Sequence, residues 1–221
     1  MDDYKQIVDT IALSMGAAWA SGVNLYAAIL VLGLLGVTEN IVLPETLQVL
    51  TEPIVLIAAG LMFIVEFVAD KTPGVDTGWD AIHTFIRIPA GAALAAGAVG
   101  NVNPAIMVAA GIVGGGVAAA THATKAGTRV LINTSPEPVT NWIASMGEDV
   151  AVVAGLWAAL NYPTVFIVLL IIFLLLLVWL LPKLWRGIKK VFGFIKRLFT
   201  GKKEEPAMET ALEPVQANDN P

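Results

Sequence analysis

The sequence predicts an all-α membrane protein, a polytopic bundle of about six transmembrane helices. Of its 221 residues, 57% are apolar and 14% are charged, and the mean hydropathy is +0.75, whereas soluble domains carry charge on about a quarter of their residues. The charges are also unevenly spread, because residues 10–38, 88–120 and 150–182 contain no acidic or basic side chain. A helix needs about 20 apolar residues to cross a bilayer, so these runs indicate several spans.

Six expected spans account for the apolar segments. They cover residues 7–36, 54–70, 79–100, 104–130, 138–160 and 163–181. Lys and Arg concentrate on the cytoplasmic side of membrane proteins, so the basic segment after residue 182 predicts a cytoplasmic C-terminus. Six spans would return the N-terminus to the same side, and the acidic 37–53 connection, which lacks Lys and Arg, would lie outside. We therefore expect an inner-membrane protein with both termini cytoplasmic.

The first expected span is too long to cross the membrane upright. Its 30 residues would extend about 45 Å at about 1.5 Å per residue. Gly weakens helices, and Ser and Asn can bond freed backbone groups, so Ser21-Gly22-Val23-Asn24 is the expected breakpoint. Either the helix is tilted and packs its small residues on a neighbour, or it is discontinuous and its ends bind an ion or a solute.

The chain divides by charge into three expected regions. Residues 1–182, with a net charge of −8, form the transmembrane domain. Residues 183–200 place apolar and basic residues on opposite faces, which predicts an amphipathic helix on an anionic membrane surface; a partner-docking helix is the alternative. Residues 201–221 are acidic from Glu204 onward and contain three prolines, which is typical of a disordered tail.

A short pattern, Ser/Thr-Pro-x-x-x-Thr-x-Trp, occurs twice, at residues 72–79 and 135–142. Each copy lies between the end of one expected span and the start of the next, so an internal repeat is one interpretation. The expected topology puts both copies on the cytoplasmic side, as in a parallel repeat. A three-plus-three division would instead give an inverted repeat.

Polar and ionisable residues at membrane depth are the candidate functional residues, because each charged group costs about 2.5–3.5 kcal/mol at a helix centre. They are Asn24 in the first span; Glu66, Asp70, Lys71, Asp76, Asp80, His83 and Arg87 around the second and third; His122, Lys125 and Arg129 on one face of the fourth; and Asn141, Ser145, Glu148 and Asp149 on one face of the fifth. Acids with His are typical of proton relays and ion sites, and a basic stripe suits an anionic solute or a lipid headgroup. Alternatively, Arg87 pairs with Glu66 or Asp70, and Lys125 and Arg129 pair with Glu148 and Asp149, so that the charges hold the bundle together.

No enzyme motif is present: the sequence lacks His-Glu-x-x-His, Gly-x-Ser-x-Gly and a Walker-type loop. We therefore expect no catalytic residue, no cofactor and no nucleic-acid partner; membrane lipids and a small ion or anionic solute are the expected partners. The absence of Cys excludes disulfides and thiolate metal sites. A metal site at His83 is disfavoured because Lys71 and Arg87 would compete with a cation.

The charged motif around the second and third spans resembles a known family. Residues 66–76, Trp79-Asp80 and 83–87 are similar to the hallmark of the bacterial membrane family catalogued as domain of unknown function 4126, and residues 21–26, 122–126 and 145–149 also resemble it. The resemblance covers roughly residues 10–160. One departure is that Ile88 separates Arg87 from Pro89, where the family has Pro directly after Arg. The resemblance implies the fold and the choice of residues, but no mechanism.

These observations favour a small transporter or channel with an intramembrane charged site. A non-catalytic membrane scaffold or assembly factor is the alternative, and a membrane-embedded enzyme has the least support. A hydrated cavity lined by the charges would favour transport, whereas a dry and fully paired network would favour the scaffold.

Overall fold

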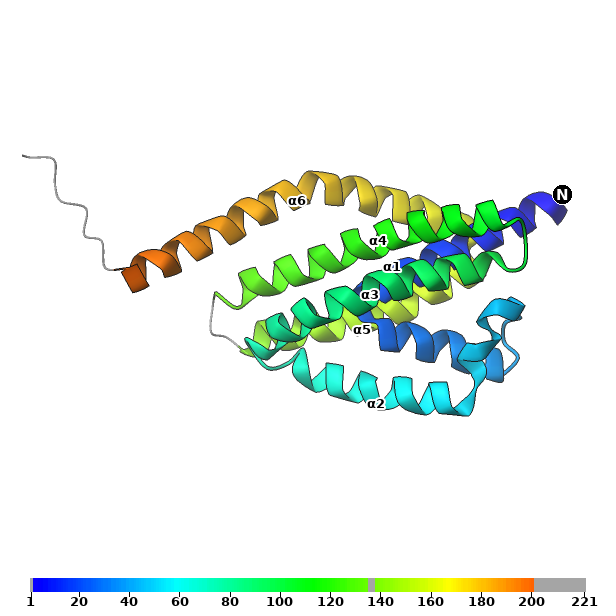
Figure 1. Ribbon diagram of the computed structural model, residues 1–221, viewed down its shortest axis with the longest axis horizontal. Helices are drawn as coiled ribbons and strands as arrows, with labels where there is room; N and C mark the ends of the chain where they lie inside the picture. Colours follow the sequence, from blue (N-terminus) through cyan, green and yellow to red (C-terminus); the bar gives the residue numbers. More distant parts are fainter. Residues whose placement is uncertain (1, 135–137, 201–221) are drawn as a thin grey trace, which may run out of the picture.

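A computed structural model describes residues 2–134 and 138–200, and every regular element within them is a helix (Figure 1). The elements are α1 (Asp2–Val37), the 3-10 helix η1 (Glu45–Thr51), α2 (Pro53–Ala69), α3 (Val75–Val99), α4 (Pro104–Ile132), α5 (Pro138–Asn161) and α6 (Pro163–Thr200). The predicted all-helical class is confirmed. By length and apolar composition, α1, α3, α4, α5 and α6 could each cross a membrane, whereas α2 meets this criterion only together with η1, from which it is bent by 64°.

Proline marks the start of four of these helices. Pro53, Pro104, Pro138 and Pro163 are the first residues of α2, α4, α5 and α6. Proline suits this position because the first backbone N–H groups of a helix have no partner within it. The helix boundaries therefore lie close to those that the apolar pattern predicted.

The helix α1 consists of two halves joined at Asn24, whose φ of −148° and ψ of 101° are not helical. The Asn24 side chain accepts a hydrogen bond from the Ala27 N–H at 3.0 Å, which caps the second half. Figure 1 shows the first half running from the N-terminus into the bundle and the second half turning back toward the same end. The break predicted within residues 21–24 is confirmed, and the helix is discontinuous rather than merely tilted.

Hydrogen bonds fix the direction of the first half of α1. The Ser14 hydroxyl donates to the Ala95 carbonyl at 2.8 Å, and the Ser21 hydroxyl donates to the Arg87 carbonyl at 3.0 Å. Later residues of α1 therefore contact earlier residues of α3. The first half of α1 runs antiparallel to α3 and reaches the middle of that helix.

The second half of α1 returns to the end from which the first half came. Gly33 lies directly against the backbone of Leu50, where a Cβ atom has no room, and Leu47 packs against Gly97 at the end of α3. The connection that contains η1 therefore lies at the same end of the bundle as the N-terminus. Helices α2 to α6 then run alternately between the two ends (Figure 1).

This arrangement corrects the expected topology. The apolar run 7–36 is not one continuous helix, because Asn24 reverses its direction, and the described chain begins and finishes at opposite ends of the bundle (Figure 1). Six spans would instead have placed both termini at one end of the bundle; the sides of the membrane on which the termini lie stay a prediction. The expected separation of the 37–53 connection from Lys71 and Arg129 is retained, because these two residues lie at the far ends of α2 and α4.

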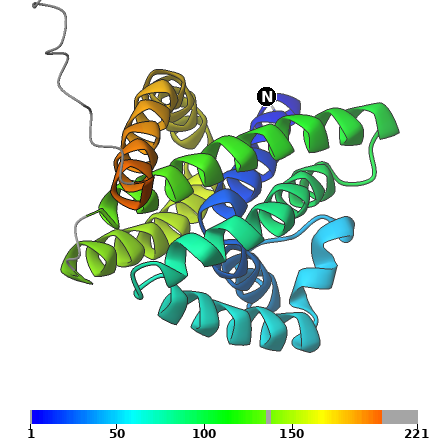
Figure 2. The ribbon, with the colours of Figure 1, turned by 60° about the vertical axis from the view of Figure 1, so that its left-hand side comes forward.

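Small residues bring α3 and α4 together. A Cβ atom on Gly114 would collide with the Ala95 side chain, and one on Gly91 would lie 2.5 Å from the Ala118 Cβ. Figure 2 shows the two helices side by side along most of their length. Such close approach is common between membrane helices, and here it sets the distance between the polar side chains that both helices carry.

The C-terminal segment differs from the expected separate helix, because α6 continues through Pro182. An internal proline removes a backbone hydrogen bond, and Figure 1 shows α6 bending along its length. Leu184 and Ile188 lie beside Gly127 of α4, so this part of the apolar face packs on the bundle. The side chains of residues 191, 192 and 194–200, and the expected disordered tail 201–221, lie outside the described residues, and the membrane-surface role stays a prediction.

The suggested repeat also stays a prediction, because residues 135–137 of its second copy lie outside the described residues. Trp79 and Trp142 are each the fifth residue of their helices, α3 and α5. Both helices begin at the same end of the bundle (Figure 1).

Candidate functional site

Charged side chains from the α2 region, α3, α4 and α5 gather at the break in α1. We call them the charged network, and its members are the acids Glu66, Asp70, Asp80, Glu148 and Asp149 and the bases Lys71, Arg87, Lys125 and Arg129. All but Glu148 and Asp149 are buried. With every group ionised, five acids and four bases leave a net charge of −1.

Arg87 connects α3 to α2. Its guanidinium lies 2.5 Å from Glu66 Oε1 and 3.1 Å from Asp80 Oδ1, and none of the three side chains is more than 1% exposed. Asp80 and Arg87 are two helical turns apart, so they share the face of α3 that points into the bundle. The predicted pairing of Arg87 with Glu66 is confirmed.

Lys125 of α4 is at the centre of the network. Its Nζ donates to Asp70 Oδ2 at 2.7 Å and to the carbonyl of Val23, the last residue before the break in α1, at 3.2 Å. The remaining carboxylate oxygens within 4 Å are Glu66 Oε1 at 3.4 Å, Glu148 Oε2 at 3.5 Å and Asp80 Oδ1 at 3.8 Å.

Arg129 follows Lys125 by one turn and connects α4 to α5. It lies 2.6 Å from Glu148 Oε2 and donates to the backbone carbonyls of Asp70 at 3.2 Å and Asn141 at 3.1 Å. The predicted ion pair between Arg129 and Glu148 is confirmed. Glu148 is also partly accessible, with 20% of its side chain exposed.

Asp149 and Lys71 complete the network beside the break. The Asn24 amide donates to Asp149 Oδ1 at 3.0 Å. Lys71, in the connection between α2 and α3, donates to Ser145 Oγ at 3.2 Å and lies over the Phe67 ring. Burial lowers the pKa of the Lys71 ammonium, and nearby carboxylates, Asp149 foremost, oppose that effect.

His122 of α4 contacts the network in its neutral form. Arg87 lies 3.1 Å from His122 Nδ1, and because Arg can only donate hydrogen bonds, this nitrogen carries no proton. The proton is therefore on Nε2, which lies 3.1 Å from the Asp80 carbonyl and 2.8 Å from the Thr84 hydroxyl.

Two predicted site residues, His83 and Asp76, form no side-chain hydrogen bond or ion pair with the charged network among the described residues. His83 stacks on Trp79 with 4.2 Å between ring centroids, and its Nε2 is 3.1 Å from the Tyr26 hydroxyl. Asp76 accepts hydrogen bonds from the Thr77 N–H and from the Asn133 amide, and so stabilises the start of α3. His83 therefore bonds to the second half of α1, and its role in the site stays a prediction.

Several buried polar atoms of the network have no hydrogen-bond partner among the described residues. They include Glu66 Oε2, Asp70 Oδ1, Asp80 Oδ2, Asp149 Oδ2 and the Nε atoms of Arg87 and Arg129. The network is therefore mostly buried but incompletely paired. Within the described part of the chain, no three His, Asp or Glu side chains are arranged to hold a metal ion.

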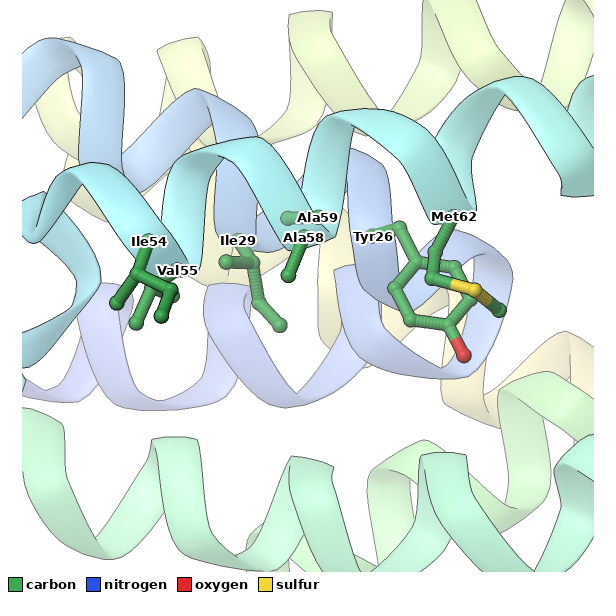
Figure 3. A pocket seen from close by; sticks show the side chains of 7 residues that line it. All are labelled: Tyr26, Ile29, Ile54, Val55, Ala58, Ala59 and Met62. Carbon is green, nitrogen blue, oxygen red and sulfur yellow. The ribbon is translucent and has the colours of Figure 1, made fainter.

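Three cavities lie near the helices without being lined by the network. One of about 330 Å³ lies between the second half of α1 and α2, where Figure 3 shows Tyr26 and Met62 at one end and Ile54 at the other. A second, of about 620 Å³, lies at the N-terminal end, and its polar lining consists of Gln6, Thr10 and Ser14. A third, of about 320 Å³, lies between α4 and α6.

The sequence did not identify three groups that contact the predicted residues. The Val23 carbonyl binds Lys125 because the break frees it from the helix, and Tyr26 and Thr84 bond the two histidines. The Val23 carbonyl had a signal, namely the breakpoint predicted at residues 21–24. Tyr26 and Thr84 lie within residues 21–26 and 83–87, which resemble the family, but neither was singled out as a site residue.

Comparison with curated proteins and with solved structures found no match to the chain. A family model described as Domain of unknown function (DUF4126) matches residues 11–183. The match spans α1 to the first half of α6 and includes every member of the charged network. The chain therefore belongs to the DUF4126 family.

Proposed function

We propose that the protein is a small membrane transporter or channel and that the charged network is its proton pathway. The observation that carries this proposal is the excess of one acid in a buried, incompletely paired network at the break of a helix. A buried negative charge without a partner is costly, so such a network takes up a proton. Ionisable groups in membrane interiors commonly form proton relays, and broken helices commonly mark transport sites.

The polar groups on either side of the network support a route between the two ends of the bundle. Glu148 is partly exposed and connects the network to one end. Toward the other end, the first half of α1 carries the buried hydroxyls of Ser21 and Ser14, and Ser14 also lines the 620 Å³ cavity with Thr10. Protons are favoured over an anionic solute because Arg87, Lys125 and Arg129 already bind carboxylates.

We also propose an orientation. Lys71, Arg129 and the basic segment of α6 lie at one end of the bundle, and the acidic connection 38–52 lies at the other. By the distribution of Lys and Arg, the basic end is cytoplasmic. The N-terminal end of α1 then lies outside.

A scaffold is the second candidate, because the ion pairs of Arg87, Lys125 and Arg129 connect α2, α3, α4 and α5.

Proton flux distinguishes a transporter or channel from a scaffold. The protein is reconstituted in liposomes that contain a pH-sensitive dye, and a potassium diffusion potential drives protons. We expect flux from the parent protein and from Glu52→Gln, an exposed acid that caps no helix N–H, and loss of flux from Glu148→Gln and Glu66→Gln. A parent protein without flux at either polarity would favour the scaffold.

A further inference from the structure

The Lys125 ammonium occupies a position that resembles a binding site for a monovalent cation. It is surrounded by the Val23 carbonyl and four carboxylates, and its nearest contact is Asp70 Oδ2 at 2.7 Å. The Val23 carbonyl is at the C-terminal end of a half-helix, which carries partial negative charge. Unwound carbonyls and half-helix C-termini are the groups that coordinate Na⁺ in many transporters.

The surrounding oxygens have unused capacity for a cation. Glu66 Oε2, Asp70 Oδ1 and Asp80 Oδ2 are buried and have no hydrogen-bond partner among the described residues. The Lys125 side chain is only 3% exposed, and its removal would leave a space next to these oxygens. It would also change the net charge of the network from −1 to −2, which one monovalent cation would restore to −1.

We propose that Lys125 determines the ion selectivity of the pathway by acting as a tethered cation that excludes alkali-metal ions. The inference rests on the proposed proton pathway. A proton can pass between carboxylates while the ammonium stays in place, whereas Na⁺ or K⁺ would need the space that the ammonium fills. The site that Lys125 vacates on substitution takes a monovalent alkali cation.

The test compares the parent protein with Lys125→Ala, with the neutral pair Lys125→Ala/Asp70→Asn, and with the control Lys190→Ala, an exposed lysine of α6. Thermal unfolding in detergent is measured in NaCl, KCl and choline chloride, and Na⁺ and K⁺ uptake is measured in liposomes. A cation that binds only the folded state raises the melting temperature with its concentration. We expect this rise, with saturable uptake, for Lys125→Ala alone.

Each other outcome is decisive. Recovery of Lys125→Ala only when it is purified in NaCl or KCl would also support the proposal. Three results would overturn the proposal. They are failure to recover folded Lys125→Ala in any of the three salts, a melting temperature of this variant that is the same in all three salts, and alkali-cation uptake by the parent protein. Proton flux by the parent protein tests the proposed function separately, because the cation-dependent melting temperature of Lys125→Ala does not require that flux.

Discussion

Replacement of Arg87 by Met and Glu66 by Leu, singly and together, measures what the central ion pair contributes. Arg87→Met leaves two buried carboxylates, Glu66 and Asp80, without the guanidinium that lies 2.5 and 3.1 Å from them. We expect this variant to lose about 3–5 kcal/mol of unfolding free energy. Glu66→Leu should lose about 3 kcal/mol, the lower limit of that range, because Arg87 still forms its ion pair with Asp80.

The double variant should lose less unfolding free energy than the two single variants lose together. It removes both charges, and the remaining loss is a hydrogen bond to Asp80, about 1–3 kcal/mol. Lys125 at 3.8 Å then is the nearest cation to Asp80. The coupling free energy should be at least about 3 kcal/mol, whereas Arg87→Met combined with the distant control Glu52→Gln should be additive within about 0.5 kcal/mol.

Unfolding in detergent, followed by helical circular dichroism, gives these free energies, and liposome flux is measured on the same preparations. We expect the double variant to keep most of its stability and to lose proton flux. Additive losses in the Glu66 and Arg87 pair would refute the assignment of this ion pair. Unchanged flux in the double variant would show that the pair serves only to hold α2 against α3.

Four further predictions follow from the fold. A reporter at residue 45 and one before residue 2 should lie on the same side of the membrane, and one after residue 200 should lie on the other side; a shared side for both ends would contradict the reversal at Asn24. Asn24→Ala removes the cap of the second half of α1 and the partner of Asp149, so it should lose about 0.5–2 kcal/mol in the same unfolding assay, and unchanged stability would count against the capping role. Gly114→Ala should lose about 1–3 kcal/mol because its Cβ collides with Ala95, whereas Gly116→Ala, which has open space, should be neutral or gain up to about 1 kcal/mol, and equal effects would contradict the packing of α3 on α4. Because the Lys71 pKa is lowered from its usual 10.5 in the folded protein, the unfolded chain binds more protons between the folded-state pKa and 10.5, and the unfolding free energy should rise with pH in that range. Lys71→Met should abolish that rise, and a rise that persists in this variant would show that Lys71 does not cause it.

Local sequence signals predicted most helix boundaries and most members of the site. The uncharged apolar runs predicted spans that start within about one residue of Pro53, Pro104 and Pro163, and the cost of charge in hydrocarbon singled out the members of the charged network as candidates. The sequence could not show that α1 reverses, because a kink and a reversal at Asn24 have the same local chemistry. It also could not exclude His83 from the network, because one helical turn separates Asp80, which faces Lys125, from His83, which faces Tyr26.

The reversal of α1 gives a physical reason for the position of the network. A helix that ends inside the bundle leaves carbonyl groups without partners, and such groups are costly to bury. Lys125 satisfies the Val23 carbonyl, and its charge in turn requires the carboxylates that surround it. A helix that crossed without a break would leave no free carbonyl there and would create no need for a buried lysine. If the charges served only as ties between helices, they could be placed anywhere along the contacts of α3 with α4, where Gly91 and Gly114 already allow close packing. The free Val23 carbonyl accounts for Lys125, but not for the further bases Arg87 and Arg129 beside the break in α1, and the proposed ion pathway accounts for these as well.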